Sequence, residues 1–447
     1  MKKQLVIDRL REEIVRLNAK LRYQERTAKE GPFGSSTPSA KVPIKANAPP
    51  ENSPRRGGAQ PGHRGHGRRD IPRAEVTREQ SLPGPERCPY CGGSLDPKGS
   101  KARTIIEVDP VRKEVIRYEL EQRDCGRCQR TFTARPAGVF AKGLFGNQFL
   151  THLATEHYVQ GVTLGHLSAQ LGAGQGSLWS ALHQLARRLA TVPPRLLLAY
   201  RRAPVKHADE TGWRTDGHNG YAWLFCTAQI SLFRFRQSRS ASVAQEVFGT
   251  KRLPGTLVVD RYNGYNQTPC SIQYCYAHLL REVQDLGQEF PAVGEVSRFV
   301  ESFAPLLAGA MKLRGQPLSP ALFGQQAREL KAQIQILVQA PAQHPGIQKI
   351  QNLFREKAAR LYHWAKNSAI PADNNRAERE LRPLVIARKI SFGSQSEQGA
   401  QTREILMSVL HTLRKRTNDL FGVFKRALDK LAEDETRDPY KLLFDSS

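Results

Sequence analysis

Residues 256–260 read Thr256-Leu257-Val258-Val259-Asp260, a short apolar run that is followed at once by a carboxylate. A run of this length and composition predicts a buried β-strand. Strand-like runs at 205–208, 221–227 and 232–235 and a helical pattern at 242–248 precede it. Three strands, a helix and a fourth strand, in that order, predict the start of a ribonuclease-H-like α/β core.

Two of the predicted strands are closed by an aspartate, Asp209 after the first and Asp260 after the fourth. Sites in α/β sheets assemble at the carboxyl ends of adjacent strands, although a single aspartate there is more often a turn residue. With a glutamate from a later helix, the two would form the all-oxygen cluster that Mg²⁺ prefers. Two such ions ~4 Å apart support an in-line displacement at a phosphate. Glu210 is a rival to Asp209, but its side chain should leave the strand on the opposite face.

The third carboxylate is expected in a helix at 373–384. This helix begins with Asp373, Asn374 and Asn375, which are residue types that cap helices. Pro383 is expected to kink or end it. Glu378 and Glu380 are both candidates, but they lie ~200° apart around a helix, so they cannot face one metal pair. Basic residues that would hold phosphates accompany them: Arg379, Arg382, Arg388 and Lys389.

Four of the seven cysteines form two C-x-x-C pairs, Cys88 with Cys91 and Cys125 with Cys128. Each pair turns two thiolates toward one point, and two pairs make the tetrahedral site of a structural zinc ion. The segment between the pairs alternates apolar residues and is expected to be β-hairpin-like. The pattern predicts a zinc ribbon at 86–135 and favours a reducing cytosol over a disulfide framework.

The 447-residue chain carries a formal net charge of +26. This excess predicts a polyanionic partner, with nucleic acid as the default and ribosome or membrane-surface binding as alternatives. No apolar run approaches the ~20 residues of a membrane span, so we expect no membrane partner. The N-terminal residues lack the pattern of a signal peptide.

The segment before the zinc ribbon predicts self-association and DNA contact. Apolar residues in 1–29 repeat at alternating spacings of three and four, which favours a parallel coiled-coil dimer, although a helix docked on its own domain gives the same pattern. Residues 30–85 are rich in Gly, Pro, Ser and Arg and indicate a linker or disordered arm. Five of its arginines are typical of a basic tail that tracks phosphates, or belong to a solvated linker without function: Arg55, Arg56, Arg64, Arg68 and Arg69.

Helices are expected in most of the remaining chain. In 140–200, a helix, a glycine turn and a second helix predict a helix-turn-helix, which either binds DNA or serves as scaffold. The core occupies 204–277 and resumes at 371–394. A helical insertion at 278–370, with helices expected at 279–286, 296–311, 322–338 and 347–364, separates its parts and either cradles DNA or covers the site. Residues 395–447 add C-terminal helices.

Four motifs together resemble the large transposase of the bacterial insertion sequence sixty-six family, a group of DDE transposases. They are His207–Thr211, Asp260–Tyr265, Asn375–Arg379 and Arg388–Ser394. The resemblance extends over nearly the whole chain. It implies a catalytic triad of Asp209, Asp260 and Glu378 that uses Mg²⁺ or Mn²⁺, and it therefore selects Glu378 over Glu380.

Cys275 and His278 resemble the C-x-x-H that follows the second aspartate in some related transposases. A core cysteine and a histidine at a helix start are the alternative. Two ligands are too few for a zinc site.

The resemblance implies binding of element ends, hydrolysis that frees a 3′-hydroxyl, and attack of that hydroxyl on target DNA. It also implies accessory proteins of the same element and a bacterial cytoplasm, close to the nucleoid. The coiled-coil pattern also predicts a homo-oligomer, at least a dimer. Two alternatives remain: a zinc-ribbon DNA-binding regulator with an inactive core, and a structure-specific nuclease of the same fold.

Overall fold

The computed structural model describes Glu13, residues 71–109 and residues 112–445. Leu196–Gly393 form one compact unit, here called the core unit. The described residues of 71–195 together with 394–445 form the second, here called the flanking unit. Apart from Glu13, the predicted coiled coil lies outside the described residues, and so do the five arginines of the linker. The prediction of a multidomain α/β protein is confirmed.

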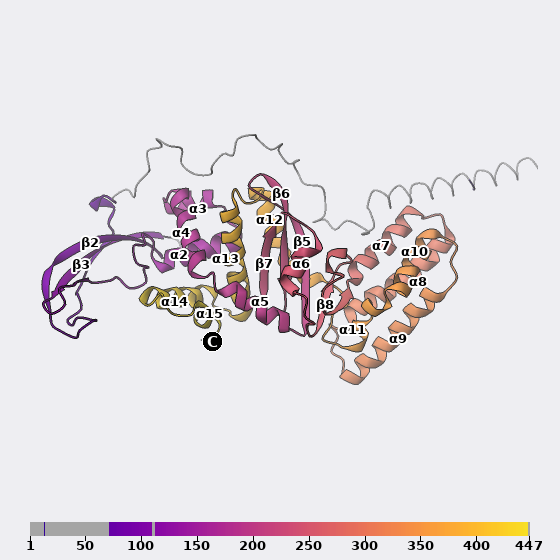
Figure 1. Cartoon of the computed structure of the whole chain (residues 1–447). Helices are drawn as coiled ribbons and strands as arrows, with labels where there is room; N and C mark the ends of the chain where they lie inside the picture. The colour runs from indigo at the N-terminus through magenta and orange to yellow at the C-terminus, as the bar shows by residue number, and fades with distance from the viewer. Residues whose placement is uncertain (1–12, 14–70, 110–111, 446–447) are drawn as a thin grey trace, which may run out of the picture. The chain divides into compact units, whose positions relative to one another are not determined.

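The core unit is built on a five-stranded sheet of order β7-β6-β5-β8-β9 (Figure 1). β6 is antiparallel to both β5 and β7, whereas β8 is parallel to both β5 and β9. The strands are β5 (Val205–Thr215), β6 (His218–Cys226), β7 (Ser231–Arg236), β8 (Thr256–Val259) and β9 (Ser271–Tyr274), and α6 (Ala241–Phe248) connects β7 to β8. The predicted strands and helix are confirmed; β9 is an addition to them.

The prediction that Asp209 closes its strand is wrong. β5 continues to Thr215, because the antiparallel partner β6 pairs with it as far as the Thr215–His218 pair. The parallel pairing of β5 with β8 does end before Asp209, at the His207–Val258 pair. Asp260 follows β8 directly, as predicted, and all four residues of β8 are buried.

The segment between β9 and the last core helix is helical, as predicted. It contains α7 (Tyr276–Glu289), α8 (Gly294–Leu313), α9 (Pro320–Gln339), α10 (Pro345–Glu356) and α11 (His363–Lys366). The expected continuous helix at 347–364 is broken after Glu356. The cause is a distant contact: the Gln273 side chain on β9 accepts the backbone N–H groups of His363 and Trp364, at 2.8 and 3.2 Å, and so starts a new helix there.

The last core helix, α12 (Asn375–Ser391), packs on β5 and β6 (Figure 1). Its apolar face of Ala377, Leu381 and Leu384 is buried. The helix runs through Pro383, so of the two outcomes predicted for this proline, the end of the helix does not occur. Proline lacks the N–H that would bond to the carbonyl of the residue four positions earlier. In α12 this residue is Arg379, which is exposed to solvent.

Gly393 terminates the core unit in a backbone conformation with φ +136°. A side chain there would collide with the carbonyl oxygen of Arg214 on β5. Glycine therefore permits the close approach of the chain to β5 after α12.

The flanking unit combines a small sheet with helices. Its strands are β1 (Arg78–Leu82), β2 (Leu95–Asp109), β3 (Arg112–Cys125) and β4 (Thr131–Thr133), in the order β1-β3-β2 with β4 also paired to β3. β2 and β3 form the predicted hairpin. The helices are α2 (Asn147–Thr155), α3 (Leu164–Leu171), α4 (Gln175–Arg188), α13 (Glu397–Arg416), α14 (Leu420–Glu433) and α15 (Pro439–Phe444), while α5 (Val192–Arg202) crosses between the units.

The helix, glycine turn and second helix expected in 140–200 are present as α3 and α4. Gly172 ends α3 with φ +57°, a conformation that favours glycine. In the part of the chain that the structure describes, no helix is both long and apolar enough to cross a bilayer.

Candidate active site

The three predicted catalytic carboxylates come from three elements of the core unit. Asp209 lies within β5, Asp260 follows β8, and Glu378 is in the first turn of α12. β5 pairs with β8, and α12 packs on β5. This arrangement places the three side chains at one region of the core, although they are separated widely in the sequence.

The charges of these carboxylates affect one another. Burial raises the pKa of Asp209 well above its usual range, and the charges of Glu210, Asp260 and Glu378 raise it further. Burial likewise raises the pKa of Asp260, with the charge of Glu378 adding to the effect. Carboxylates crowded in this way repel one another, and a bound cation would relieve the repulsion.

Local hydrogen bonds fix both aspartates. One Asp209 oxygen, Oδ1, accepts the backbone N–H of Glu210 at 2.9 Å. Asp260 Oδ1 accepts the backbone N–H of Tyr262 at 3.0 Å. Each bond uses a single oxygen and sets the orientation of the other, so the pair is oriented before any ligand arrives.

The two candidate glutamates of α12 have different surroundings. Glu380 accepts a hydrogen bond from the Ser231 hydroxyl of β7 at 2.8 Å. Glu378 instead faces His278, with 3.9 Å between its Oε1 and the histidine Nδ1. The helical geometry thus separates the two side chains, as expected.

Glu210, the rival to Asp209, is held by residues outside the predicted triad. It accepts hydrogen bonds from the Arg239 guanidinium and the Tyr265 hydroxyl, both at 2.6 Å. Burial, together with the charge of Asp260, raises the pKa of Glu210 to about 7. Sequence reasoning missed Arg239, which has no motif around it and comes near the site only through the fold.

Asn374 is a further residue whose contacts the sequence pattern did not predict. It occupies the N-cap position of α12, but its side chain turns to β5 rather than capping the helix. Its amide group donates to the Ala208 carbonyl at 2.8 Å, and its Oδ1 lies 2.9 Å from His207 Nδ1. Its backbone N–H donates to the Cys275 sulfur at 3.1 Å.

Four basic residues of α12 were predicted to hold phosphates. Arg379, Arg382 and Lys389 are exposed. Arg388 has a different environment, because its guanidinium donates to the Thr211 hydroxyl at 2.9 Å and the Gly212 carbonyl at 2.8 Å. Arg388 therefore braces α12 against β5.

Cys275 and His278 lie where β9 leads into α7, and Glu378 joins them. One potential ligand atom from each of the three residues lies within 4.8 Å of the others. Burial lowers the pKa of His278, and the charge of Glu378 opposes this shift. Among the described residues, Asp209, Asp260 and Glu378 are not close enough for one carboxylate oxygen of each to lie within 4.8 Å of the other two.

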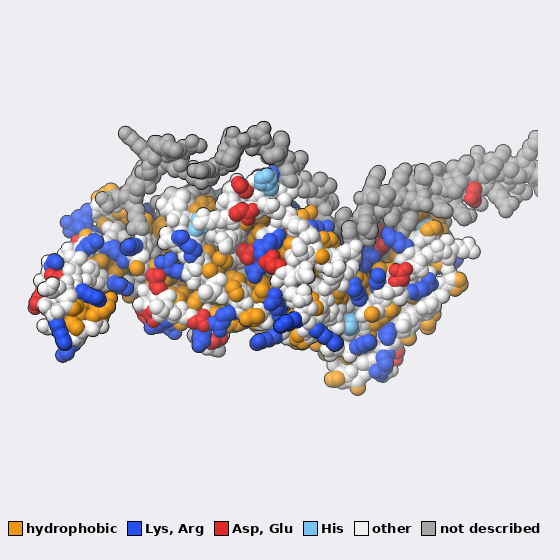
Figure 2. Space-filling model, viewed as in Figure 1, with side chains coloured by type: hydrophobic (Ala, Val, Ile, Leu, Met, Phe, Trp, Pro, Cys, Tyr) orange, Lys and Arg blue, Asp and Glu red, His pale blue; other side chains and the backbone are white. Residues whose placement is uncertain are grey.

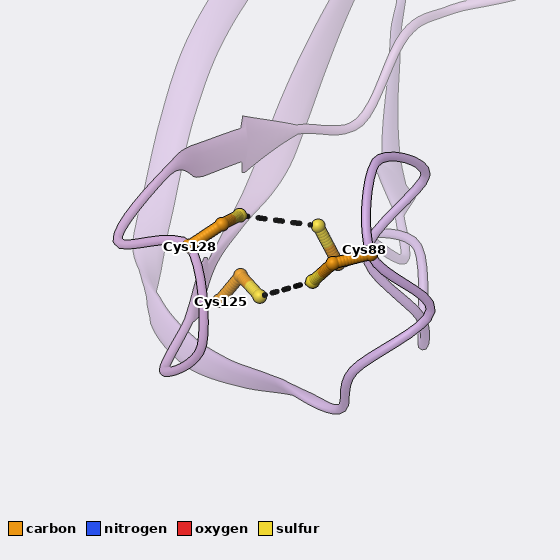
Figure 3. A group of neighbouring side chains, drawn as sticks. Cys88, Cys125 and Cys128 are labelled. Carbon is orange, nitrogen blue, oxygen red and sulfur yellow. Dashed lines mark hydrogen bonds between the residues drawn. The ribbon is translucent and has the colours of Figure 1, made fainter.

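The four predicted zinc ligands come together in the flanking unit. Cys88 and Cys128 have their sulfur atoms 3.4 Å apart, and Cys91 and Cys125 do likewise (Figure 3). Ligand atoms from all four lie within 4.8 Å of one another. Four sulfur donors at this spacing fit a tetrahedral zinc ion.

Both cysteine pairs are folded into the same kind of turn. Gly92 N–H donates to the Cys88 carbonyl and Gln129 N–H donates to the Cys125 carbonyl, each at 2.8 Å. Gly92 and Gln129, which follow the second cysteine of each pair, have positive φ values of 69° and 51°. The two turns present their thiols to one point from opposite sides, as the sequence predicted.

A transposase family profile matches residues 142–402, more than half of the chain. The chain belongs to the IS66 family of transposases. The match includes the core unit described above and the α3–α4 pair.

Two bacterial relatives from Sinorhizobium fredii (strain NBRC 101917 / NGR234) are similar over most of the chain. The uncharacterized protein y4jD is 24% identical over 82% of this chain and 78% of its own length. The uncharacterized protein y4hP is 22% identical over 84% of this chain and 75% of its own length. The similarity therefore extends beyond the matched profile on at least one side.

Proposed function

We propose that this transposase cuts and joins DNA through Asp209, Asp260 and Glu378, as a member of the DDE group. The observation that carries the proposal is the placement of three carboxylates on the paired strand region of β5 and β8 and on α12, which packs against β5, so that their charges interact. A carboxylate cluster of this composition would hold Mg²⁺ or Mn²⁺. When bound, such ions polarise phosphate oxygens and lower the pKa of an attacking hydroxyl.

The chain's own residues would orient the reacting groups. Asp209 and Asp260 are fixed by backbone N–H groups, and Glu378 is carried on a helix braced by Arg388. In the first step, water attacks a phosphodiester, the bond to the 3′ oxygen breaks, and a 3′-hydroxyl is released. In the second, that hydroxyl attacks a target phosphodiester and displaces another 3′-hydroxyl. Each step makes one P–O bond and breaks one.

The sheet of the core unit supports assignment to the ribonuclease-H-like fold. Three antiparallel strands, β5 to β7, are extended by the parallel strands β8 and β9 on the other side of β5. The long helical segment before α12 then interrupts this core, as proposed from the sequence. In such an interrupted fold, Asp209 and Asp260 precede the helical segment in the sequence and Glu378 follows it, yet all three belong to one proposed site.

We propose DNA as the partner of the exposed basic residues. Figure 2 shows Lys and Arg side chains over much of the visible face. On α12, Arg379 and Arg382 follow Glu378 closely and are exposed, so both would meet the backbone of a DNA strand held at the site. The α3–α4 pair and the linker arginines are proposed to bind DNA as well.

The remaining parts of the proposal rest on sequence patterns. The four cysteines would hold a structural zinc ion, the N-terminal helix would form at least a dimer, and accessory proteins of the same element would assist. A DNA substrate would place the protein with the bacterial nucleoid in the cytoplasm.

Replacing both Arg379 and Arg382 by alanine is expected to weaken DNA binding uniformly across sequences. Because each phosphate contact releases about one counterion, the slope of log K against log salt should become less steep by roughly two. Fluorescence anisotropy at several salt concentrations measures this slope. The control is Arg437→Ala, since Arg437 is already paired with Glu433 and Asp434, at 3.6 and 3.8 Å. An unchanged slope in the double variant would mean that these two arginines of α12 do not contact DNA.

A cleavage and joining assay tests the proposed function. Wild-type protein is incubated with Mg²⁺ and labelled DNA that carries the ends of its own element, and both cut strands and joined products are expected. Asp260→Ala should give neither. Cutting without any joining would favour the structure-specific nuclease, whereas binding without metal-dependent cutting in either protein would favour the inactive regulator.

A further inference from the structure

His278 is a buried histidine whose ring has no hydrogen-bond partner among the described residues. It lies in the first turn of α7 and is 5% exposed, and both ring nitrogens are inaccessible to solvent and unbonded. Leaving such a group unsatisfied costs about 1–3 kcal/mol. A residue kept in this state needs an explanation other than stability.

The atom that faces the ring is also unsatisfied. Glu378 Oε1 is buried and makes no hydrogen bond within the described part of the chain. It lies 3.9 Å from His278 Nδ1, which is too far for a hydrogen bond. A small rotation of either side chain would close the gap and satisfy both groups.

The helix α12 is anchored in a position that makes Glu378 face His278. Asn374 is 1% exposed and joins the start of α12 to His207 and Ala208 of β5. Its backbone N–H donates to the sulfur of Cys275, the N-cap residue of α7. Glu378 follows Asn374 by one helical turn, and its N–H donates to the Asn374 carbonyl at 3.3 Å. The anchor therefore fixes the position of Glu378 relative to α7.

We propose that His278 is a positioning residue for Glu378. An imidazole N–H donates to Glu378 Oε1 once the site is loaded and holds the second carboxylate oxygen toward Asp209 and Asp260. This inference rests on the proposed function, because it assigns the orientation of a proposed metal ligand. Outer partners of this kind typically alter metal affinity or activity about 10- to 100-fold.

The same three residues suggest a competing arrangement, in which Cys275, His278 and Glu378 bind a zinc-like ion themselves. The hydrogen bonds favour positioning. The Cys275 sulfur already accepts the Asn374 N–H that anchors α12. Three protein ligands also leave a structural zinc site one short.

Mn²⁺ binding to the full-length protein tests the inference without reference to catalysis. The main variant is His278→Leu, which removes the donor but retains most of the volume, so it should fold at least as well as wild type. We expect its melting temperature to be unchanged or higher while its Mn²⁺ affinity, measured by electron paramagnetic resonance, falls about tenfold or more. His278→Asn, which offers an N–H near the position of Nδ1, should recover part of the affinity. His218→Ala, at an exposed histidine where β6 begins, is the control.

The outcomes separate this inference from the proposed function. Wild-type protein that neither binds Mn²⁺ nor cleaves DNA contradicts both. Wild-type protein that does bind Mn²⁺, with equal affinity in folded His278→Leu, overturns only the role of His278. A zinc ion additional to that of the four cysteines, lost in both Cys275→Ser and His278→Leu, overturns positioning in favour of the competing metal site. In cleavage assays, lower kcat at unchanged KM for DNA, partly restored by more Mg²⁺, would support positioning.

Discussion

Glu378→Gln is expected to abolish Mg²⁺-dependent cleavage of element ends, with a loss of roughly a thousandfold or more, the scale seen when a residue of a catalytic unit is removed. The substitution keeps the size of the side chain and removes its charge. An amide oxygen is a much poorer ligand for a hard cation than a carboxylate oxygen. Single-turnover cleavage of a labelled oligonucleotide measures the loss.

Glu380→Gln is the matched control, two residues away in the same helix. Its carboxylate bonds to Ser231 at 2.8 Å, on β7, so its replacement should leave the cleavage rate within about threefold of wild type. DNA binding by both variants should remain intact. If Glu380→Gln lost cleavage and Glu378→Gln retained it, the assignment of the third carboxylate would be reversed.

Cys88→Ser is expected to release the zinc ion and unfold the zinc ribbon. Around the four thiols only Cys88, Leu95 and Cys125 are buried among the described residues, so at this end of the module the metal must supply what a larger apolar core would provide. Structural zinc contributes ~10 kcal/mol or more in such small modules. Metal analysis should show one zinc per chain in wild type and none in the variant, and limited proteolysis should cut between residues 86 and 135.

Cys270→Ser is the control for this experiment. Cys270 lies in the core unit, outside either group of potential metal ligands in the described residues. It should retain one zinc ion and the wild-type protease pattern. Wild-type protein without zinc, together with normal folding of Cys88→Ser, would refute the zinc ribbon.

Local patterns predicted much of the fold. The buried run before Asp260 is β8, and the alternating segment between the cysteine pairs is the β2–β3 hairpin, since both signals depend on neighbouring residues. Predictions failed where a distant partner decides the outcome. β5 extends past Asp209 because β6 pairs with it. The helix expected at 347–364 breaks because Gln273 starts a new helix at His363.

The candidate site divides in the same way. Residue type and strand context suggested Asp209 and Asp260, and the helical angle separated Glu378 from Glu380. The Asn374 anchor was not foreseen, because its partners His207 and Cys275 lie 167 and 99 residues away in the sequence. Asparagine at a helix start predicts a cap, and only the fold shows its side chain turned to β5.

Asp209, Asp260 and Glu378 together are proposed to hold the divalent ions. Crystals of the protein with DNA and Mn²⁺, measured for anomalous scattering from manganese, test this proposal most directly. We expect two peaks ~4 Å apart, in contact with carboxylate oxygens of all three residues and with a phosphate of the DNA. Manganese absent from Asp209 and Asp260, or bound only beside Cys275 and His278, would contradict it.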